Sequence, residues 1–345
     1  ASLELPAMGC TIRYEYGLFR QRIVDGQQVE LPDYWLGNGN VWEMPVMEDA
    51  CEVHFNGHVE MGNENGRTVF RHVGYNTVEA VPYDMPLVGY DTSTVNSLRL
   101  WSARAPKRID LSDFNHGHYV QASEEKELAE AISNILYPED NHYEGKLLRL
   151  KQQYFFTSAT LQYILKDFKK LNGTNWSKLP EKVVIHINDT HPGLAIPELM
   201  RLLMDVHGQE WDTAWEITTK IFAYTNHTLL PEALETWPSR IVGKILPRHL
   251  QIIYEINRRF MDYAREKFGN DSEKLGKVSI VSGEGDNQII RMANLSIVGS
   301  FSVNGVAKLH SELIKTSLVP EFYELWPEKF TNVTNGITPR RWLLH

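Results

Sequence analysis

Three clusters of polar residues in this sequence carry side chains suited to binding a polar ligand. Residues 188–192 read Asn-Asp-Thr-His-Pro, residues 224–228 read Tyr-Thr-Asn-His-Thr, and residues 332–342 read Asn-Val-Thr-Asn-Gly-Ile-Thr-Pro-Arg-Arg-Trp. The first two directly follow the short apolar runs 183–187 and 221–224. Ligands of open α/β sheets bind beyond the carboxyl ends of the strands, so these two clusters are the first candidates for a binding site.

Each cluster also has a purely structural interpretation. The first cluster can be a turn, or the start of a helix that Asp189 or Thr190 caps with Pro192 near its first turn, and the second cluster can be a capped loop. Arg340 and Arg341 can bind phosphate or carboxylate through their forked donors, or they can be a solvated pair. The recurrence of a polar cluster after two successive apolar runs favours a functional interpretation of the first two.

A fourth polar segment, 137–145, lies between two stretches with helical periodicity. It offers the carboxylates of Glu139, Asp140 and Glu144 beside aromatic side chains and Asn141. This composition is typical of a loop that contacts sugar, and equally of a tight turn.

Several kinds of site have no motif in this chain. The sequence holds no GxxxxGK[ST], GxSxG, HExxH or CxxC pattern, which argues against nucleotide-cradling, serine-hydrolase and zinc chemistry. His186 and His191 are five residues apart and do not share a helix face, so we expect no metal site. Asn, Asp, His and aromatic side chains without a cofactor motif point weakly to a neutral, polyhydroxylated ligand such as a carbohydrate.

Composition narrows the class of protein further. The chain has 345 residues, and 44 acidic against 35 basic residues give a net charge of −9, which draws it neither to nucleic acid nor to an anionic membrane. Two cysteines, with no recognisable signal peptide or long apolar segment, predict a cytoplasmic location. The length predicts about two domains or one large one.

The periodicity of apolar residues changes along the chain. Residues 11–104 alternate, with hairpin signals at Asp25-Gly26 and Asn56-Gly57, and predict antiparallel β structure. Helical spacing begins at residue 123, and a long helix is expected at about 146–170, ending near Gly173. Short apolar runs then alternate with helical stretches, which predicts a doubly wound α/β sheet behind the antiparallel section. The expected strands are 183–187, 221–224 and 295–299, and the expected helices are 197–206, 241–268 and 303–314.

The polar clusters, in this order, resemble those of the α-glucan phosphorylases. The matching stretches run along almost the whole chain: 14–17, 100–104, 136–138, 148–152, 188–192, 223–228, 246–249, 303–307 and 334–342. The resemblance implies a retaining glycosyltransferase in which inorganic phosphate cleaves terminal α-1,4 bonds of glycogen or maltodextrin to give glucose 1-phosphate. It also implies pyridoxal phosphate as cofactor, in an enzyme that is a homodimer when full length.

The family fold is a pair of Rossmann-like domains of the B-type glycosyltransferase (GT-B) architecture. The resemblance identifies residues 1–345 as part of the N-terminal domain, with a mainly β section at 1–120 and an α/β section at 121–345. The C-terminal domain, which carries the cofactor's lysine, is expected outside this chain. We therefore expect the chain alone to be inactive.

Residue roles carry over by motif. His227 and Asn335 resemble the family's catalytic groups at the glucosyl 6-hydroxyl, and the backbone carbonyl of His227 is expected near the charge of the transition state. Binding of this kind lowers a barrier because the groups are fixed before charge develops. Asp140 and Asn141 resemble a gate loop. The remaining positions implied are Asp189 and His191 on the acceptor side, Val306 beside the sugar, and Arg341 and Trp342 against the cofactor.

Two departures from the family pattern bear on regulation. Lys166-Asp167 stands where regulated members have an arginine pair that grips a nucleotide phosphate, and His142 replaces an aromatic of their purine site. We expect no activation by nucleotides. The alternative function is a non-catalytic glucan-binding or regulatory module, although the presence of His227 and Asn335 argues against it.

Overall fold

A computed structural model of the chain describes residues 1–64, 66–106, 126–136 and 138–337. These residues divide into two compact units. The first unit comprises Ala1–His58 and His72–Asp167, and the second comprises Val59–Arg71 and Phe168–His345. The predicted change of structure at about residue 120 lies outside the described residues and stays a prediction. No helix in the described part of the chain is long and apolar enough to cross a membrane.

The first unit is built on a five-stranded sheet. Its strands are β1 (Met8–Ile12), β4 (Met44–Pro45), β5 (Cys51–Phe55), β8 (Asn76–Val88) and β9 (Val95–Arg104). The order is β1-β9-β8-β4, and β5 also pairs with β8. All of these pairings are antiparallel except that of β1 with β9, which is parallel. The unit is therefore of mixed sheet type.

The two turn dipeptides of this region have different outcomes. Asp25 and Gly26 have φ angles of 51° and 76° and join β2 (Arg20–Val24) to β3 (Gln27–Leu31) in an antiparallel hairpin, as predicted. Asn56 and Gly57 also adopt positive φ angles, but the strands beside them do not pair with each other. Instead β5 pairs with β8, whereas β6 (His58–Glu64) pairs with β7 (Arg67–Val73). The second hairpin prediction is wrong, because a positive-φ turn permits a reversal without choosing the partner strand.

Helix α3 (Tyr143–Asn172) is the long helix that the sequence predicts. Gly173 follows it with a φ angle of 71°, the left-handed conformation expected of a glycine just past a helix end. In the first unit, Tyr154 packs edge to face on Phe55 of β5. The indole Nε1 of Trp101 donates to Thr160 Oγ1 at 3.0 Å. The apolar stripe of α3 therefore covers this sheet.

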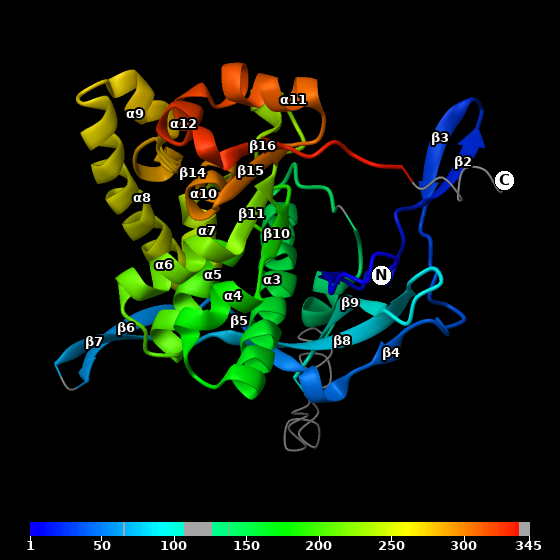
Figure 1. Cartoon of the computed structure of the whole chain (residues 1–345). Coiled ribbons are helices and arrows are strands. Elements are labelled where there is room, and N and C mark those ends of the chain that lie inside the picture. The colour runs from blue at the N-terminus through cyan, green and yellow to red at the C-terminus, as the bar shows by residue number, and fades with distance from the viewer. Residues whose placement is uncertain (65, 107–125, 137, 338–345) are drawn as a thin grey trace. The chain divides into compact units, whose positions relative to one another are not determined.

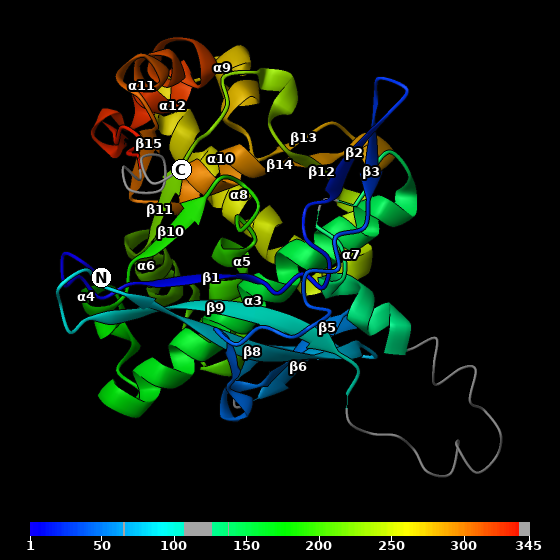
Figure 2. The ribbon, with the colours of Figure 1, turned by 90° about the vertical axis from the view of Figure 1, so that its right-hand side faces the viewer.

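The second unit contains a four-stranded sheet in the order β10-β11-β15-β16 (Figures 1 and 2). Every pairing in it is parallel. Its strands are β10 (Ile185–Asn188), β11 (Phe222–Thr225), β15 (Ser302–Gly305) and β16 (Phe330–Asn332). Helical connections separate successive strands, as a parallel sheet requires. Two of the three predicted strands are thus confirmed.

The third predicted strand is wrong. Residues 295–299 belong to α10 (Met292–Gly299), and the strand follows it as β15. Every residue of α10 is buried, so its sequence shows neither an exposed face nor a helical period, and a short apolar run of this kind does not distinguish a buried helix from a buried strand. The helix expected at 303–314 accordingly begins later, as α11 at Lys308.

The remaining elements of the second unit surround this sheet. The helices are α4 (Leu179–Lys182), α5 (Ala195–Arg201), α6 (Trp211–Ile221), α7 (Ser239–Ile245), α8 (Pro247–Phe268), α9 (Ser272–Val278), α11 (Lys308–Leu313) and α12 (Pro320–Leu325). Strands β12 (Thr236–Pro238), β13 (Val281–Ser282) and β14 (Ile289–Arg291) form a small antiparallel sheet. Helix α10 contacts β11 and also α5 and α6, so it lies in the core of the unit.

Candidate functional site

The carboxyl ends of the four parallel strands lie along one edge of the second unit's sheet. The strands end at Asn188, Thr225, Gly305 and Asn332. All the site residues that the sequence predicts in the described part of this unit follow these ends. The parallel register therefore places them along one edge, as expected of a ligand site in an open sheet.

Backbone hydrogen bonds continue beyond the strands and tie the following loops together. The N–H of Asp189 donates to Thr225 O at 3.2 Å, and that of Asn226 donates to Asn304 O at 3.0 Å. On the other side of β15, the N–H of Asn335 donates to Val306 O at 3.0 Å. The loops that carry the predicted residues are thus extensions of the sheet.

A chain of side-chain hydrogen bonds crosses the same edge. Thr225 Oγ1 donates to Asn304 Oδ1 at 2.6 Å and lies 2.5 Å from His186 Nε2. A hydroxyl has one proton, so Thr225 accepts from His186, and Nε2 of that ring carries a hydrogen. Burial lowers the pKa of His186, and the nearby ring of His227 lowers it further. Neutral His186 therefore serves as a fixed donor within the sheet edge.

His227 lies at the exposed surface of this layer. Its Nε2 is 2.7 Å from Oδ1 of Asn188, the last residue of β10. An amide oxygen only accepts, so the ring donates from Nε2, and in the neutral ring Nδ1 is then the acceptor. The described part of the chain gives Nδ1 no hydrogen-bond partner. Asn188 belongs to the first polar cluster, but its contact with His227 depends on the strand register and is not predictable from the sequence.

The loop that carries His227 is braced from below by Asn226. The buried amide of Asn226 donates to the hydroxyl of Tyr224 at 3.2 Å and accepts from the N–H of Thr228 at 3.1 Å. Burial raises the pKa of Tyr224, which keeps its hydroxyl neutral. Asn226 and Tyr224 therefore fill the structural role considered for this cluster, while His227 faces outward.

Asp189 and His191 follow β10, but they do not cap a helix. Asp189 has a left-handed φ angle of 63°, and its Oδ1 accepts from the N–H of Thr190 at 2.7 Å. Helix α5 begins only at Ala195 and has no side-chain cap. The capping interpretation is wrong, because the turn at 190–194 separates the polar cluster from the helix. His191 is half-buried, and the described residues give its side chain no hydrogen-bond partner.

Val306 and Asn335 are held together by their backbones, and the side chain of Asn335 is exposed. The N–H of Val306 donates to Nδ1 of His310 at 3.0 Å. Before it, Gly305 approaches α11 so closely that a Cβ would lie 2.6 Å from Oγ of Ser311. Position 305 therefore requires glycine. Arg341 and Trp342 lie outside the described residues.

The predicted gate residues Asp140 and Asn141 belong to the first unit. Asp140 Oδ2 pairs with Nη1 of Arg149 at 2.6 Å, and Asn141 Nδ2 donates to Oε1 of Glu139 at 3.0 Å. The loop closes onto the start of α3, where the N–H of Gly145 donates to His142 Nδ1 at 2.9 Å. Local contacts of exposed or half-buried side chains thus define this loop.

A buried ionic cluster lies among the helices of the second unit. Glu198 of α5 is fully buried, accepts from Arg201 at 2.7 and 2.8 Å, and accepts from His249 Nε2 at 2.6 Å. Burial alone would raise the pKa of Glu198, but Arg201 and His249 hold it well below its usual range. Burial also lowers the pKa of His249 despite that carboxylate. This cluster joins α5 to α8, and it has no ligand-facing role.

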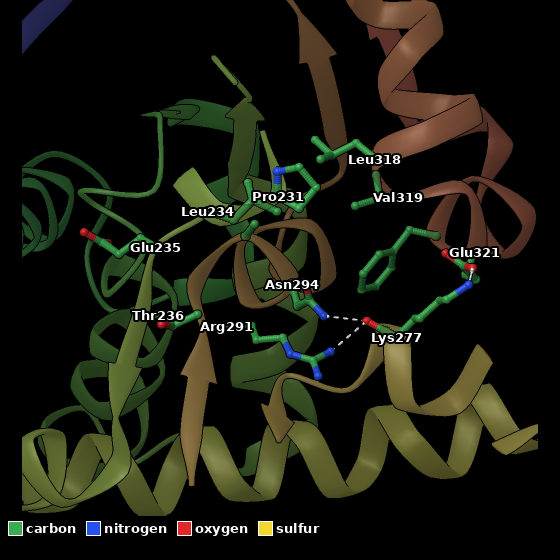
Figure 3. Close-up of a pocket in the computed structure, with 12 residues that line it drawn as sticks. Pro231, Leu234, Glu235, Thr236, Lys277, Arg291, Asn294, Leu318, Val319 and Glu321 are labelled. Atoms are coloured by element: carbon green, nitrogen blue, oxygen red, sulfur yellow. Dashed lines mark hydrogen bonds and ion pairs between the residues drawn. The ribbon is translucent and has the colours of Figure 1, made fainter. Parts of the chain in front are cut away.

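A cavity of about 270 Å³ lies elsewhere in the second unit (Figure 3). Its polar wall includes Arg291 and Asn294, which donate to backbone carbonyls within residues 276–279 at the end of α9. Pro231, Leu234, Leu318, Val319 and Phe322 supply its apolar wall. No predicted site residue lines it, and Arg291 and Asn294 already cap a helix end. The strand ends therefore remain the candidate site.

The strand-end layer carries hydrogen-bonding side chains that are mostly neutral, with Asp189 as a carboxylate. Asn188, His227 and Asn335 provide amide and imidazole groups, and within the described residues no cluster of three His, Cys, Asp or Glu side chains has the geometry of a metal site. Donors and acceptors fixed on rigid strand ends suit a ligand that carries several hydroxyl groups.

Comparisons with known proteins identify the family of the chain. The family model for carbohydrate phosphorylases matches residues 1–345. The brain form of glycogen phosphorylase from Bos taurus and the liver form from Homo sapiens are each 53% identical to the chain over 351 aligned residues, and the brain form from Rattus norvegicus is 52% identical. These alignments cover 100% of this chain and 41% of each relative. The chain therefore belongs to the carbohydrate phosphorylase family.

Proposed function

We propose that the protein of which this chain is a part catalyses the phosphorolysis of terminal α-1,4 bonds in glycogen or maltodextrin and releases glucose 1-phosphate. The observation that carries the proposal is the layer of neutral donors and acceptors on the strand ends, above all His227 on Asn188. Relatives named glycogen phosphorylase support it over the whole length of the chain. Because the chain spans 41% of these relatives, the activity is proposed for the full-length protein.

The parallel sheet with its strand-end site supports the assignment to one Rossmann-like half of a GT-B enzyme. In this proposal, residues 1–345 form most of the N-terminal domain, with a mainly β section at 1–120 and an α/β section at 121–345. A C-terminal domain completes the cleft. Asp189 and His191 contact the acceptor side of the glucan, and Val306 lies beside the sugar. Asp140 and Asn141 contribute from the gate loop.

Pyridoxal phosphate is the proposed cofactor. None of the candidate residues on the strand ends is a lysine, which fits attachment of the cofactor to a lysine outside the chain. Arg341 and Trp342 would be the contacts from this chain. When bound, the cofactor supplies a phosphate group that relays a proton to the substrate phosphate.

The chain's own residues bind and orient the glucosyl unit. His227 presents Nδ1 as an acceptor for a sugar hydroxyl while its Nε2 is occupied by Asn188. Asn335, tied through its backbone to Val306, supplies an amide to the same unit. Both groups are held on extensions of the sheet. The hydrogen bonds to the transition state therefore form without the cost of ordering a loop.

The test is turnover of the full-length protein with maltooligosaccharide or glycogen and inorganic phosphate. Glucose 1-phosphate should appear, and His227→Ala or Asn335→Ala should lower kcat and kcat/KM together, on the order of 100-fold. Asn270→Ala, which removes an exposed amide in the turn after α8, is the matched control and should leave both unchanged. Absence of turnover in the unaltered protein would refute the proposal. A raised KM with unchanged kcat would mean that the two residues contribute only uniform binding.

The chain alone should show no phosphorolysis, since the C-terminal domain is required for the cofactor. Reconstitution of residues 1–345 with pyridoxal phosphate should give neither bound-cofactor absorbance nor glucose 1-phosphate. Calorimetric titration with maltooligosaccharide separates this proposal from the alternative of a glucan-binding or regulatory module. Binding by a full-length protein that lacks turnover would favour the module.

We also propose that nucleotides do not activate the enzyme. Lys166 Nζ is held 2.9 Å from Oδ1 of Asp49 and 2.6 Å from the backbone oxygen of Glu48. Its charge is therefore already paired, and the neighbouring Asp167 repels phosphate. A rise in the activity of the full-length protein with AMP would contradict this.

Glucan and inorganic phosphate are the proposed partners of a cytoplasmic homodimer. The net charge of −9 argues against nucleic acid or an anionic membrane surface as a partner. Sedimentation of the full-length protein tests the dimer.

A further inference from the structure

Asn188 is positioned by the sheet in a way that bears on the protonation state of His227. Along the β10–β11 edge, His186 pairs in register with Ala223 but its ring contacts Thr225, two residues further on. Asn188 pairs in register with Thr225, and its amide contacts His227, again two residues further on. The second contact therefore repeats the geometry of the first beyond the last strand residue.

We propose that Asn188 is a positioning residue that holds His227 as the neutral tautomer with Nε2 protonated, so that Nδ1 accepts a hydrogen bond from a glucosyl hydroxyl. The inference rests on the function proposed above. Asn188 itself need not touch the substrate. It acts through the 2.7 Å hydrogen bond that its Oδ1 accepts from the ring.

The neighbouring groups favour this arrangement. Thr225 is already engaged by His186 and Asn304, which leaves Asn188 as the partner that the described residues provide for the ring of His227. Among the described residues, the ionisable groups at these strand ends include His186 on β10, Asp189, His191 and His310. Burial and His227 keep the pKa of His186 low, and two protonated rings in this layer would repel each other. A neutral amide at position 188 adds no charge that would favour the protonated ring.

The direction of a pH effect follows from this role. The neutral ring is the active form, since a protonated ring has no acceptor at Nδ1. A carboxylate at position 188 keeps the hydrogen bond but stabilises the protonated ring. In Asn188→Asp, the acidic limb of the kcat/KM profile should therefore move to higher pH by about one unit, with near-normal activity on the alkaline side.

The kinetic experiment uses the full-length protein with maltooligosaccharide and phosphate. Asn188→Ala should lower kcat and kcat/KM together by about tenfold, the value of one hydrogen bond that aligns an active-site ring. At pH values above the acidic limb, Asn188→Asp should retain most of the activity that Asn188→Ala loses. Asn270→Asp introduces the same charge in an exposed turn and should leave the profile unchanged. A loss in both Asn188 variants without movement of the limb would show a merely structural role and overturn the proposal.

A second measurement separates this proposal from the proposed function. In ligand-free full-length protein labelled at histidine Cε1, the resonance of His227, assigned from His227→Gln, should titrate about one pH unit higher in Asn188→Asp than in the unaltered protein. If the unaltered protein shows no phosphorolysis but the titration moves, the proposed function fails while the Asn188–His227 contact stands without a substrate role. An unmoved titration overturns the proposal whatever the activity.

Discussion

The strand ends of the second unit and the loop 138–145 of the first unit each carry residues proposed to bind substrate, yet they are held in different ways. At the strand ends, backbone hydrogen bonds such as Asn335 to Val306 extend the sheet under the exposed side chains. In the loop, Asp140 is held by one partly exposed ion pair with Arg149. Groups on the sheet are therefore fixed before a ligand arrives, whereas the loop can rearrange at little cost.

The buried ionic cluster among the helices stabilises the second unit, whose strand ends are the rigid region in this comparison. Breaking this cluster should have the largest effect on the free energy of unfolding. Glu198→Ala leaves the half-buried Arg201 and the buried His249 without their shared acceptor, so the free energy of unfolding should fall by about 3–5 kcal/mol. Urea denaturation followed by circular dichroism measures this. Glu216→Ala removes an exposed carboxylate paired with Lys220 and should cost less than about 1 kcal/mol. Equal losses in the two variants would mean that the buried cluster stabilises the fold no more than an exposed ion pair does.

The close approach at Gly305 should give the next largest effect. In Gly305→Ala, the new Cβ would meet Ser311 Oγ at 2.6 Å and its backbone N and Cα at 2.9 Å, so α11 or the strand end must shift. Overpacking of this kind costs about 1–3 kcal/mol, again measurable by urea denaturation. Gly276→Ala in α9 is the control, because a Cβ there meets nothing within 4 Å and a helix gains up to about 1 kcal/mol from the exchange. If Gly305→Ala leaves the free energy of unfolding unchanged, the strand end is less rigid than its contacts indicate.

Acidification should also lower the free energy of unfolding of the second unit, but by a smaller amount. The pKa of His249 lies below its ordinary value of 6.5 in the folded chain, so below pH 6.5 the unfolded chain binds a proton that the folded chain does not. Stability therefore falls as pH falls, by at most about 1.4 kcal/mol per pH unit for one such site. Glu198, whose pKa is also depressed, adds the same sign of dependence below its ordinary value of 4.5.

The measurement compares urea midpoints at pH 7 and pH 5 in the unaltered protein and in His249→Gln. The variant should lose about 1 kcal/mol less on acidification, because it lacks the buried ring that titrates in this window. Contributions from His186 and His207, whose pKa values are also lowered by burial, are common to both proteins. A pH dependence that is the same in both would exclude His249 as its source.

The sequence predicts the strand ends of the second unit and the gate loop to different extents. The strands before Asn188 and Asn226 are recognisable because a β-branched or aromatic run is followed at once by polar residues. The run at 295–299 misleads because α10 is buried on every side and carries no periodic signal. The register that brings Asn188 to His227 is a tertiary property, and no local pattern contains it. The α-helix after the gate loop is predictable, but the contacts within the loop are not.

The loop should show the smallest effect on stability and a measurable effect on its own opening. Arg149→Met removes the partner of Asp140 but keeps an unbranched apolar side chain, so the free energy of unfolding should change by less than about 1 kcal/mol. If the same free energy is lost from the closed state of the loop, the loop opens more often. A glutamate-specific protease should then cleave after Glu139 about two- to fivefold faster. Arg258→Met, which breaks exposed pairs with Glu255 and Asp262 on α8, should leave that cleavage unchanged. Unchanged cleavage in Arg149→Met would mean that close packing at Gly145 restrains the loop instead, since a Cβ there would lie 1.9 Å from the Glu139 carbonyl oxygen. The backbone would then hold this loop as firmly as it holds the strand ends.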